Sequence, residues 1–170
     1  MAQRKLLISG LKIGYEGLFD VQDFLKLIDD WFKQYGYEKA ELTNIERVKN
    51  TGKVIDLDLL PTKKITDFVK YEMSLRVRIE NLTETTVKKD DQKFKINKGN
   101  VSLEINAFLT TDLENEWESK PMFYFFRALM DKYFNKKYMS QYEKGLTTDV
   151  QILHSELKSY FNLSRLITHN

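Results

Sequence analysis

The stretch KYEMSLRVRIE at residues 70–80 decides the fold, because apolar and polar side chains alternate along it without a break. Successive side chains of a β-strand point to opposite faces of a sheet, so the alternation produces one apolar face and one polar face. A strand with one buried and one solvated face is typical of an antiparallel sheet. We therefore predict a buried face made of Tyr71, Met73, Leu75, Val77 and Ile79.

The same period of two continues on both sides of this stretch. Upstream, residues 40–59 predict a hairpin whose turn is formed by residues 50–52 and which ends at Pro61. Downstream, residues 85–111 predict a second hairpin, with its turn at residues 98–100. Both hairpins extend the sheet that the central stretch begins.

The N-terminal part of the chain predicts one strand and one helix. Residues 5–13 alternate on either side of Gly10, which indicates a strand with a bend or bulge at that glycine. Residues 21–35 place apolar side chains at spacings of one, three and four, as an amphipathic helix does. Asp20 is the expected N-cap, and Gly36 is expected to end the helix in a left-handed conformation.

Beyond Asp112 the pattern becomes helical and aromatic. Pro121 suits the first position of a helix that runs through Phe134, and residues 135–147 are expected to form a polar loop. Thr148 and Gln151 have the spacing of a capping box, which predicts a last helix starting there. The C-terminal part should therefore contain two helices.

These elements define an α+β fold. We expect a single antiparallel sheet of about five to six strands, packed by one N-terminal helix and two C-terminal helices as a two-layer sandwich. Helix-grip proteins, in which a curved sheet holds a C-terminal helix, have a similar order of elements. No linker rich in proline, glycine or serine and no internal repeat divides the sequence, so we expect one domain over residues 1–170.

Composition excludes several classes of protein and of site. With 27 basic and 25 acidic residues the net charge is +2, so nucleic-acid binding would need a local basic patch. The absence of cysteine excludes disulfides, thiol nucleophiles and thiolate metal sites. No apolar window of about 18 residues exists, and the N-terminus lacks a signal sequence, so we expect no membrane span and a cytoplasmic location.

Catalytic signatures are missing from the sequence. The two histidines, His154 and His169, are too few for an ordinary metal site, and the paired carboxylates Asp56 and Asp58 are expected to face water. Neither a glycine-rich phosphate loop nor a nucleophile elbow is present. We expect no catalytic residue, metal or cofactor, and the sequence points away from an enzyme without excluding one.

Aromatic residues in the C-terminal part are candidates for an interaction surface. Aromatic side chains there can form core, meet a partner chain or line a ligand pocket, and the sequence leaves all three open. The candidate residues are Trp117, Phe123, Phe126, Tyr138 and Tyr142. The leading hypothesis is a non-catalytic protein-interaction or assembly module, which binds other chains or itself. An apolar small-molecule binding protein with a helix-grip-like cavity is the alternative.

A lysine-rich hairpin supports a second alternative, an RNA or ribosome-associated protein. Lysines can contact phosphates, and arginines on the exposed face of the central strand could extend such a surface. Because Phe94 alternates with lysines, we expect it to face the core. The candidate nucleic-acid contacts are Arg76, Arg78, Lys88, Lys89, Lys93 and Lys95.

Two blocks near the C-terminus resemble segments of uncharacterised proteins of archaea. They are KPMFYFFR at residues 120–127 and YEKGL at residues 142–146. The resemblance covers about a third of the chain. It implies no activity, so it assigns a function to no residue.

Overall fold

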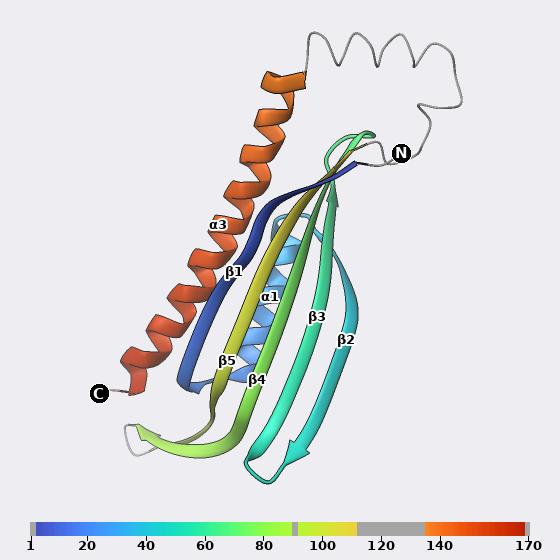
Figure 1. Ribbon diagram of the computed structural model, residues 1–170. Coiled ribbons are helices and arrows are strands. Elements are labelled where there is room, and N and C mark those ends of the chain that lie inside the picture. The colour runs from blue at the N-terminus through green and yellow to red at the C-terminus, as the bar shows by residue number, and fades with distance from the viewer. Residues whose placement is uncertain (1–2, 90–91, 112–134, 169–170) are drawn as a thin grey trace.

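The computed structural model describes residues 3–89, 92–111 and 135–168 (Figure 1). Five strands form one antiparallel sheet in the order β1-β5-β4-β3-β2. The strands are β1 (Gln3–Phe19), β2 (Glu38–Lys49), β3 (Gly52–Lys64), β4 (Val69–Lys89) and β5 (Gln92–Thr111). The described helices are α1 (Val21–Gln34) and α3 (Asn135–Thr168). The predicted α+β class with an antiparallel sheet is confirmed.

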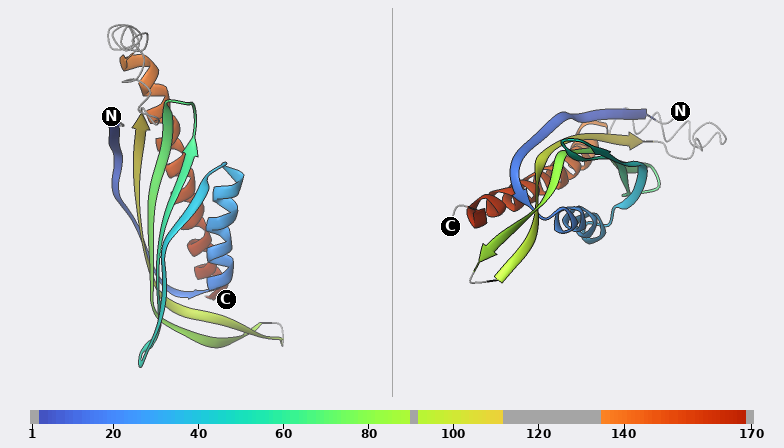
Figure 2. Two further views of the ribbon diagram at one scale, coloured as in Figure 1. Left: turned by 90° about the vertical axis from the view of Figure 1, so that its right-hand side faces the viewer. Right: turned by 90° about the horizontal axis from the view of Figure 1, so that it is seen from below.

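Both helices lie on the same face of the sheet, as the edge-on view shows (Figure 2). Along β4, the exposed fractions of Met73, Leu75, Val77 and Ile79 are all 1% or less. Matching residues of β5, from Val101 to Leu109, are exposed by 3% or less under the helices. The alternation of the central stretch therefore predicted the buried face correctly.

The N-terminal predictions also hold. Asp20 caps α1, and its Oδ1 accepts a hydrogen bond of 3.0 Å from the backbone N–H of Asp23. Gly36 follows the helix with a φ of 72°, which favours glycine. β1 is longer than expected, but its pairing with β5 does shift around Gly10, which has a φ of 65°. The side chain of Asn106 fixes this bulge by accepting the N–H of Gly10 at 2.7 Å.

The predicted loop at residues 135–147 is wrong, because that segment belongs to α3. The last helix therefore starts earlier than the capping box indicated. Packing explains this, since Leu146, Val150 and Leu153 form one buried stripe that continues across Thr148. The predicted helix that begins at Pro121 lies outside the described residues.

The predicted turn at residues 98–100 is also wrong. β5 runs through it without interruption, and β4 and β5 stay paired as far as Lys89 and Gln92. Gly99 marks a close approach instead of a turn, because a Cβ there would lie 3.1 Å from the carbonyl oxygen of Glu80. The pairing of β4 with β5 shifts opposite this glycine, at Asn81, which has a φ of 53°.

Candidate interaction surfaces

β2 is one edge of the sheet, and it is exposed along nearly its whole length. Its large apolar side chains are exposed as well, by 63% at Leu42, 39% at Ile45 and 86% at Val48. α1 lies behind the middle strands, and β2 forms the right-hand margin in Figure 1. An edge strand has a row of backbone N–H and C=O groups free to pair with another strand. β2 therefore combines free pairing capacity with apolar side chains.

The apolar residues of β2 lie on both faces of the sheet. Ile45 pairs with Asp56 and so lies on the face away from the helices, whereas Glu46 pairs with the buried Ile55. By the alternation of a strand, Val48 lies on the same face as Glu46. Leu42 has no partner in β3, because the register shifts there. A core on one side of the sheet does not explain apolar residues on two faces.

The opposite edge of the sheet, β1, is protected. Its pairing is interrupted by register shifts between Leu6 and Leu11, and α3 packs beside it. The side chain of His154 on α3 hydrogen-bonds to the backbone of Lys12, and Lys5 Nζ lies 2.7 Å from Glu143 Oε1. Bulges and covering elements are known ways to prevent edge-to-edge pairing. Among the described residues, β2 is tied to α1 only near its start, where Lys39 Nζ lies 2.7 Å from Asp29 Oδ1, and its residues from Asn44 to Lys49 are all exposed.

The apolar residues of β2 were missed as a site in the sequence. The signal was present, since Leu42, Ile45 and Val48 break the strict alternation seen in β4. A strand with apolar residues at both odd and even positions cannot place them all in a one-sided core. Such a pattern indicates either a strand buried on both faces or an exposed edge that binds something.

A second exposed feature is a two-stranded ribbon, formed by residues 85–89 of β4 and 92–96 of β5, which pair only with each other. It extends beyond the rest of the sheet and curls toward the helix side (Figure 2). Val87 and Phe94 are paired and so share one face, whereas Lys88 and Lys93 share the other. The ribbon thus has an apolar face and a basic face.

Phe94 does not face the core, contrary to the prediction, because its side chain is 51% exposed. The alternation correctly placed Phe94 on the face opposite to Lys93 and Lys95. That face is not covered, because the ribbon lies past the described helices. Lys88, Lys93 and Lys95 are exposed on the other face, and Lys95 Nζ lies 3.8 Å from Glu84 Oε2. The side chain of Lys89 lies outside the described residues.

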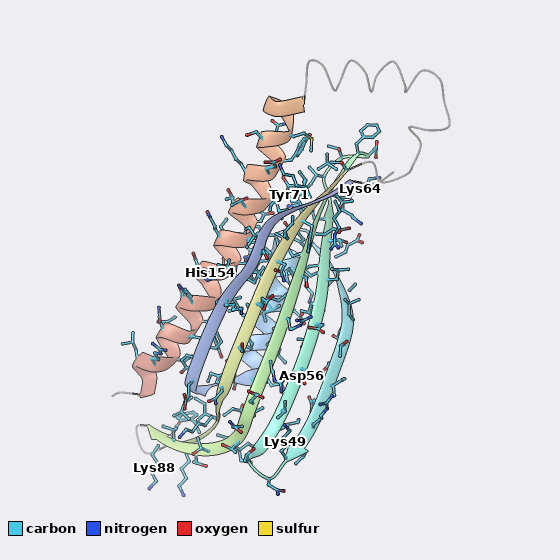
Figure 3. All side chains as sticks on the ribbon, in the orientation of Figure 1. Lys49, Asp56, Lys64, Tyr71, Lys88 and His154 are labelled. Atoms are coloured by element: carbon cyan, nitrogen blue, oxygen red, sulfur yellow. The ribbon has the colours of Figure 1, made fainter. Side chains whose placement is uncertain are left out.

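Arg76 and Arg78 do not join this basic face. Arg76 Nε lies 3.0 Å from Asp58 Oδ1, and Arg78 Nη2 lies 3.0 Å from Glu80 Oε1. Adjacent carboxylates therefore neutralise both arginines. At about 3.3 Å per residue of strand, Lys88 lies up to about 33 Å beyond Arg78, and Figure 3 shows it at the far end of the sheet.

The predicted aromatic candidates do not form a described surface. Trp117, Phe123 and Phe126 lie outside the described residues, as does the side chain of Tyr138 near the start of α3. Tyr142 is partly buried and packs against the core. The aromatic interaction surface therefore stays a prediction.

Buried tyrosines serve as structural hydrogen-bond donors. Tyr37 Oη donates to Asp149 Oδ2 on α3 at 2.7 Å, and Lys63 Nζ lies 3.9 Å from the same oxygen. Burial, followed by the hydrogen bond to Asp149, raises the pKa of Tyr37, and burial raises the pKa of Tyr71 to about 12. Both phenols stay protonated at neutral pH, so neither is a ready nucleophile or general base.

His154 and Glu72 are likewise tied into the structure. Burial, with a contribution from the charge of Lys158, lowers the pKa of His154 and so favours the neutral imidazole. Burial alone would raise the pKa of Glu72, but the hydrogen bond and charge of Lys70, together with a hydrogen bond from Thr110 and the charge of Arg4, hold that pKa below its usual value. Arg4 Nε also lies 2.9 Å from Glu72 Oε2, so this carboxylate is occupied by structural partners.

Within the described ranges, His, Asp and Glu side chains form no group of three or more that could hold a metal ion. The described helices include none with the length and apolar character needed to cross a membrane.

Across residues 3–89, 92–111 and 135–168, the fold and the exposed surfaces define an α+β protein with an exposed edge strand, β2. Comparisons with protein-family models, with curated proteins and with solved structures found no match. The resemblance to archaeal proteins therefore stays a prediction.

Proposed function

We propose that this chain is a non-catalytic protein-interaction module that binds other protein chains through the edge of β2. One observation carries the proposal: β2 is an edge strand with Leu42, Ile45 and Val48 exposed. In strand addition, backbone hydrogen bonds supply affinity and the side chains between them supply specificity. Inward-pointing charges, proline and bulges can keep an edge strand unpaired. β2 has one bulge, between Glu41 and Thr43, and its Glu46 on the helix face is ion-paired with Lys53 of β3. From Thr43 to Lys49, β2 pairs with β3 in one regular register.

The alternative of an apolar small-molecule carrier has less support. It rests on the helix-grip-like order of elements, in which β1 pairs with the last strand and a long C-terminal helix covers the sheet. A carrier would hold its ligand between that helix and the sheet. Leu153 and Leu157 of α3 and Ile105 of β5 are exposed by 1% or less, and they belong to one continuous cluster of packed side chains. That packing favours the edge of β2 over the interior as the binding surface.

The proposal is tested by placing charge on the edge of β2. The double variant Ile45→Lys, Val48→Lys should lose at least about ten-fold in binding to partner proteins retained by the wild-type chain, because charges oppose strand addition. Both side chains are exposed, so the free energy of unfolding should change by less than about 0.5 kcal/mol per site. Affinity capture with quantitative mass spectrometry measures the first quantity and urea unfolding the second.

Leu166→Lys is the matched control, because Leu166 is 66% exposed but lies on α3. It should retain the same partner proteins as the wild type. Retention of those proteins by the β2 variant would contradict the proposal.

A second candidate function, RNA binding, is supported by the ribbon. Lys88, Lys93 and Lys95 share its basic face, and the exposed Phe94 offers a ring on which a base could stack. Since the ring and the lysines lie on opposite faces, a bound single strand would have to wrap around the ribbon. This requirement makes RNA binding the weaker of the two candidates.

Charge reversal tests the RNA candidate. Affinity for RNA falls as the salt concentration rises. Replacing Lys88, Lys93 and Lys95 by glutamate should reduce the steepness of the plot of log affinity against log salt concentration by about 2, the value expected for losing three phosphate contacts to a single strand. Replacing three exposed helical lysines, Lys26, Lys33 and Lys158, gives the same change in net charge. Fluorescence anisotropy with a labelled RNA measures both variants, and equal effects in the two would exclude a specific role for the ribbon.

A further inference from the structure

The edge of β2 restricts how it could pair with a second copy of itself. Two copies of β2 that are related by a two-fold axis pair in the antiparallel direction. Each possible register of this pairing is therefore centred on the position of β2 where the axis passes. Along an edge, backbone groups alternate between pointing outward and pointing to the neighbouring strand. Two residues that face each other must therefore both have odd numbers or both have even numbers. This means that the two-fold axis passes through a residue and not between two residues.

One centre gives complementary pairs throughout. With the axis at Ile45, this residue faces its own counterpart on the face away from the helices. Thr43 faces Arg47 of the second copy, and Val48 lies beside the bulge of the second copy that contains Leu42. The large exposed apolar side chains of β2 then lie at the junction, and no like charges face each other in the regular segment from Thr43 to Arg47.

Neighbouring centres give unfavourable pairs. With the axis at Asn44, the acidic Glu46 would lie opposite the bulge at Leu42 of the second copy. An axis at Glu46 would place two carboxylates directly opposite each other. An axis at Thr43 would put the bulge at Leu42 in the middle of the paired segment, where regular pairing is interrupted. Like charges directly opposite in a sheet are destabilising.

We propose that two copies of this chain associate by antiparallel pairing of β2 with β2, centred on Ile45, so that two five-stranded sheets become one continuous sheet. The inference rests on the proposed function and names the partner as a second copy. Both faces of the new junction contain apolar contacts, Ile45 on one side and Leu42 with Val48 on the other. This pairing accounts for the apolar side chains on both faces of β2, which a core on one side of the sheet does not explain.

The register is tested by disulfide formation, since the chain has no cysteine of its own. Single cysteines are placed at Thr43, Asn44, Ile45 and Glu46, and the covalent dimer is measured by non-reducing electrophoresis after mild oxidation. Residues directly opposite have Cα atoms about 5 Å apart, whereas Asn44 would lie about 8 Å from its own counterpart, beyond disulfide range. We expect at least about five-fold more covalent dimer for Ile45→Cys than for the other three.

Light scattering coupled to size-exclusion chromatography measures the association itself. The wild-type chain should run as a dimer at about 100 µM, and Ile45→Glu should weaken the dimer at least ten-fold by placing two carboxylates opposite each other. Leu166→Glu, an exposed helical control, should remain dimeric. A monomeric wild type, or equal disulfide yields at all four positions, would overturn the self-pairing. If partner proteins were still lost specifically with the β2 lysine variant, the proposed function would stand without it.

Discussion

Replacing Phe161 by alanine is expected to lower the free energy of unfolding by about 3–5 kcal/mol, the cost of removing a large aromatic side chain from a packed core. Phe161 is 3% exposed and lies where α3, α1 and β1 meet. Its ring stacks on Tyr15 with a centroid distance of 4.5 Å and lies 5.1 Å from the ring of Phe24. Truncation would leave a cavity bounded by three elements, which cannot all move in to fill it.

A matched control is available on the same helix. Leu163 is 61% exposed, so Leu163→Ala should change the free energy of unfolding by less than about 0.5 kcal/mol. Phe161→Leu should fall between the two, since it retains part of the apolar volume. Urea titration followed by circular dichroism measures all three variants. Equal costs for Phe161→Ala and Leu163→Ala would contradict the packing of α3 against β1 and α1.

Gly145→Ala is expected to destabilise the protein by about 1–3 kcal/mol, although alanine is the better helix former by about 1 kcal/mol. The reason is the close approach of Tyr71, whose hydroxyl oxygen occupies the space that a Cβ on Gly145 would need. Tyr71 is 5% exposed, so its ring cannot swing aside without disturbing its neighbours. Here steric conflict with a buried tyrosine outweighs helix propensity.

The explanation for Gly145 is tested in a second background. Without the hydroxyl group of Tyr71, the nearest ring carbon, Cζ, would lie 3.5 Å from the new Cβ, which is an ordinary contact. In a Tyr71→Phe background, Gly145→Ala should therefore be neutral or stabilising. A double-mutant cycle by urea unfolding measures the difference. The same penalty in both backgrounds would show that Tyr71 is not its cause.

The sequence predicted those elements whose signals are local. Alternation in β4 was strict enough to assign its buried face, and Asp20 and Gly36 marked both ends of α1 by known capping chemistry. These signals need no knowledge of the rest of the fold. They were therefore interpreted correctly.

The predictions that failed depend on tertiary contacts. Gly99 and Gly145 suggest turns or loops locally, but each lies within a regular element, at a point where another part of the chain approaches it closely. Thr148 suggested a helix start, yet the buried stripe on either side of it continues the helix. Packing from distant residues outweighed local preference at these positions.

The candidate surfaces were predicted only in part. The lysines of the ribbon were identified from composition, but whether Phe94 was covered depended on where the helices end relative to the ribbon. The edge of β2 could not be located before the strand order was known. Ile45 and Val48 become significant only when no described neighbour lies beyond their strand.

The pairing of β1 with β5 has a consequence for synthesis of the chain. Gln3 pairs with Thr111, so the first strand made must wait for the last strand of the sheet before it can bond. At about 5–20 residues per second, a ribosome needs roughly 5–20 seconds to make the intervening segment. During that time the nascent N-terminus has no native partner, and folding must close a loop of more than a hundred residues, which is typical of slow folders.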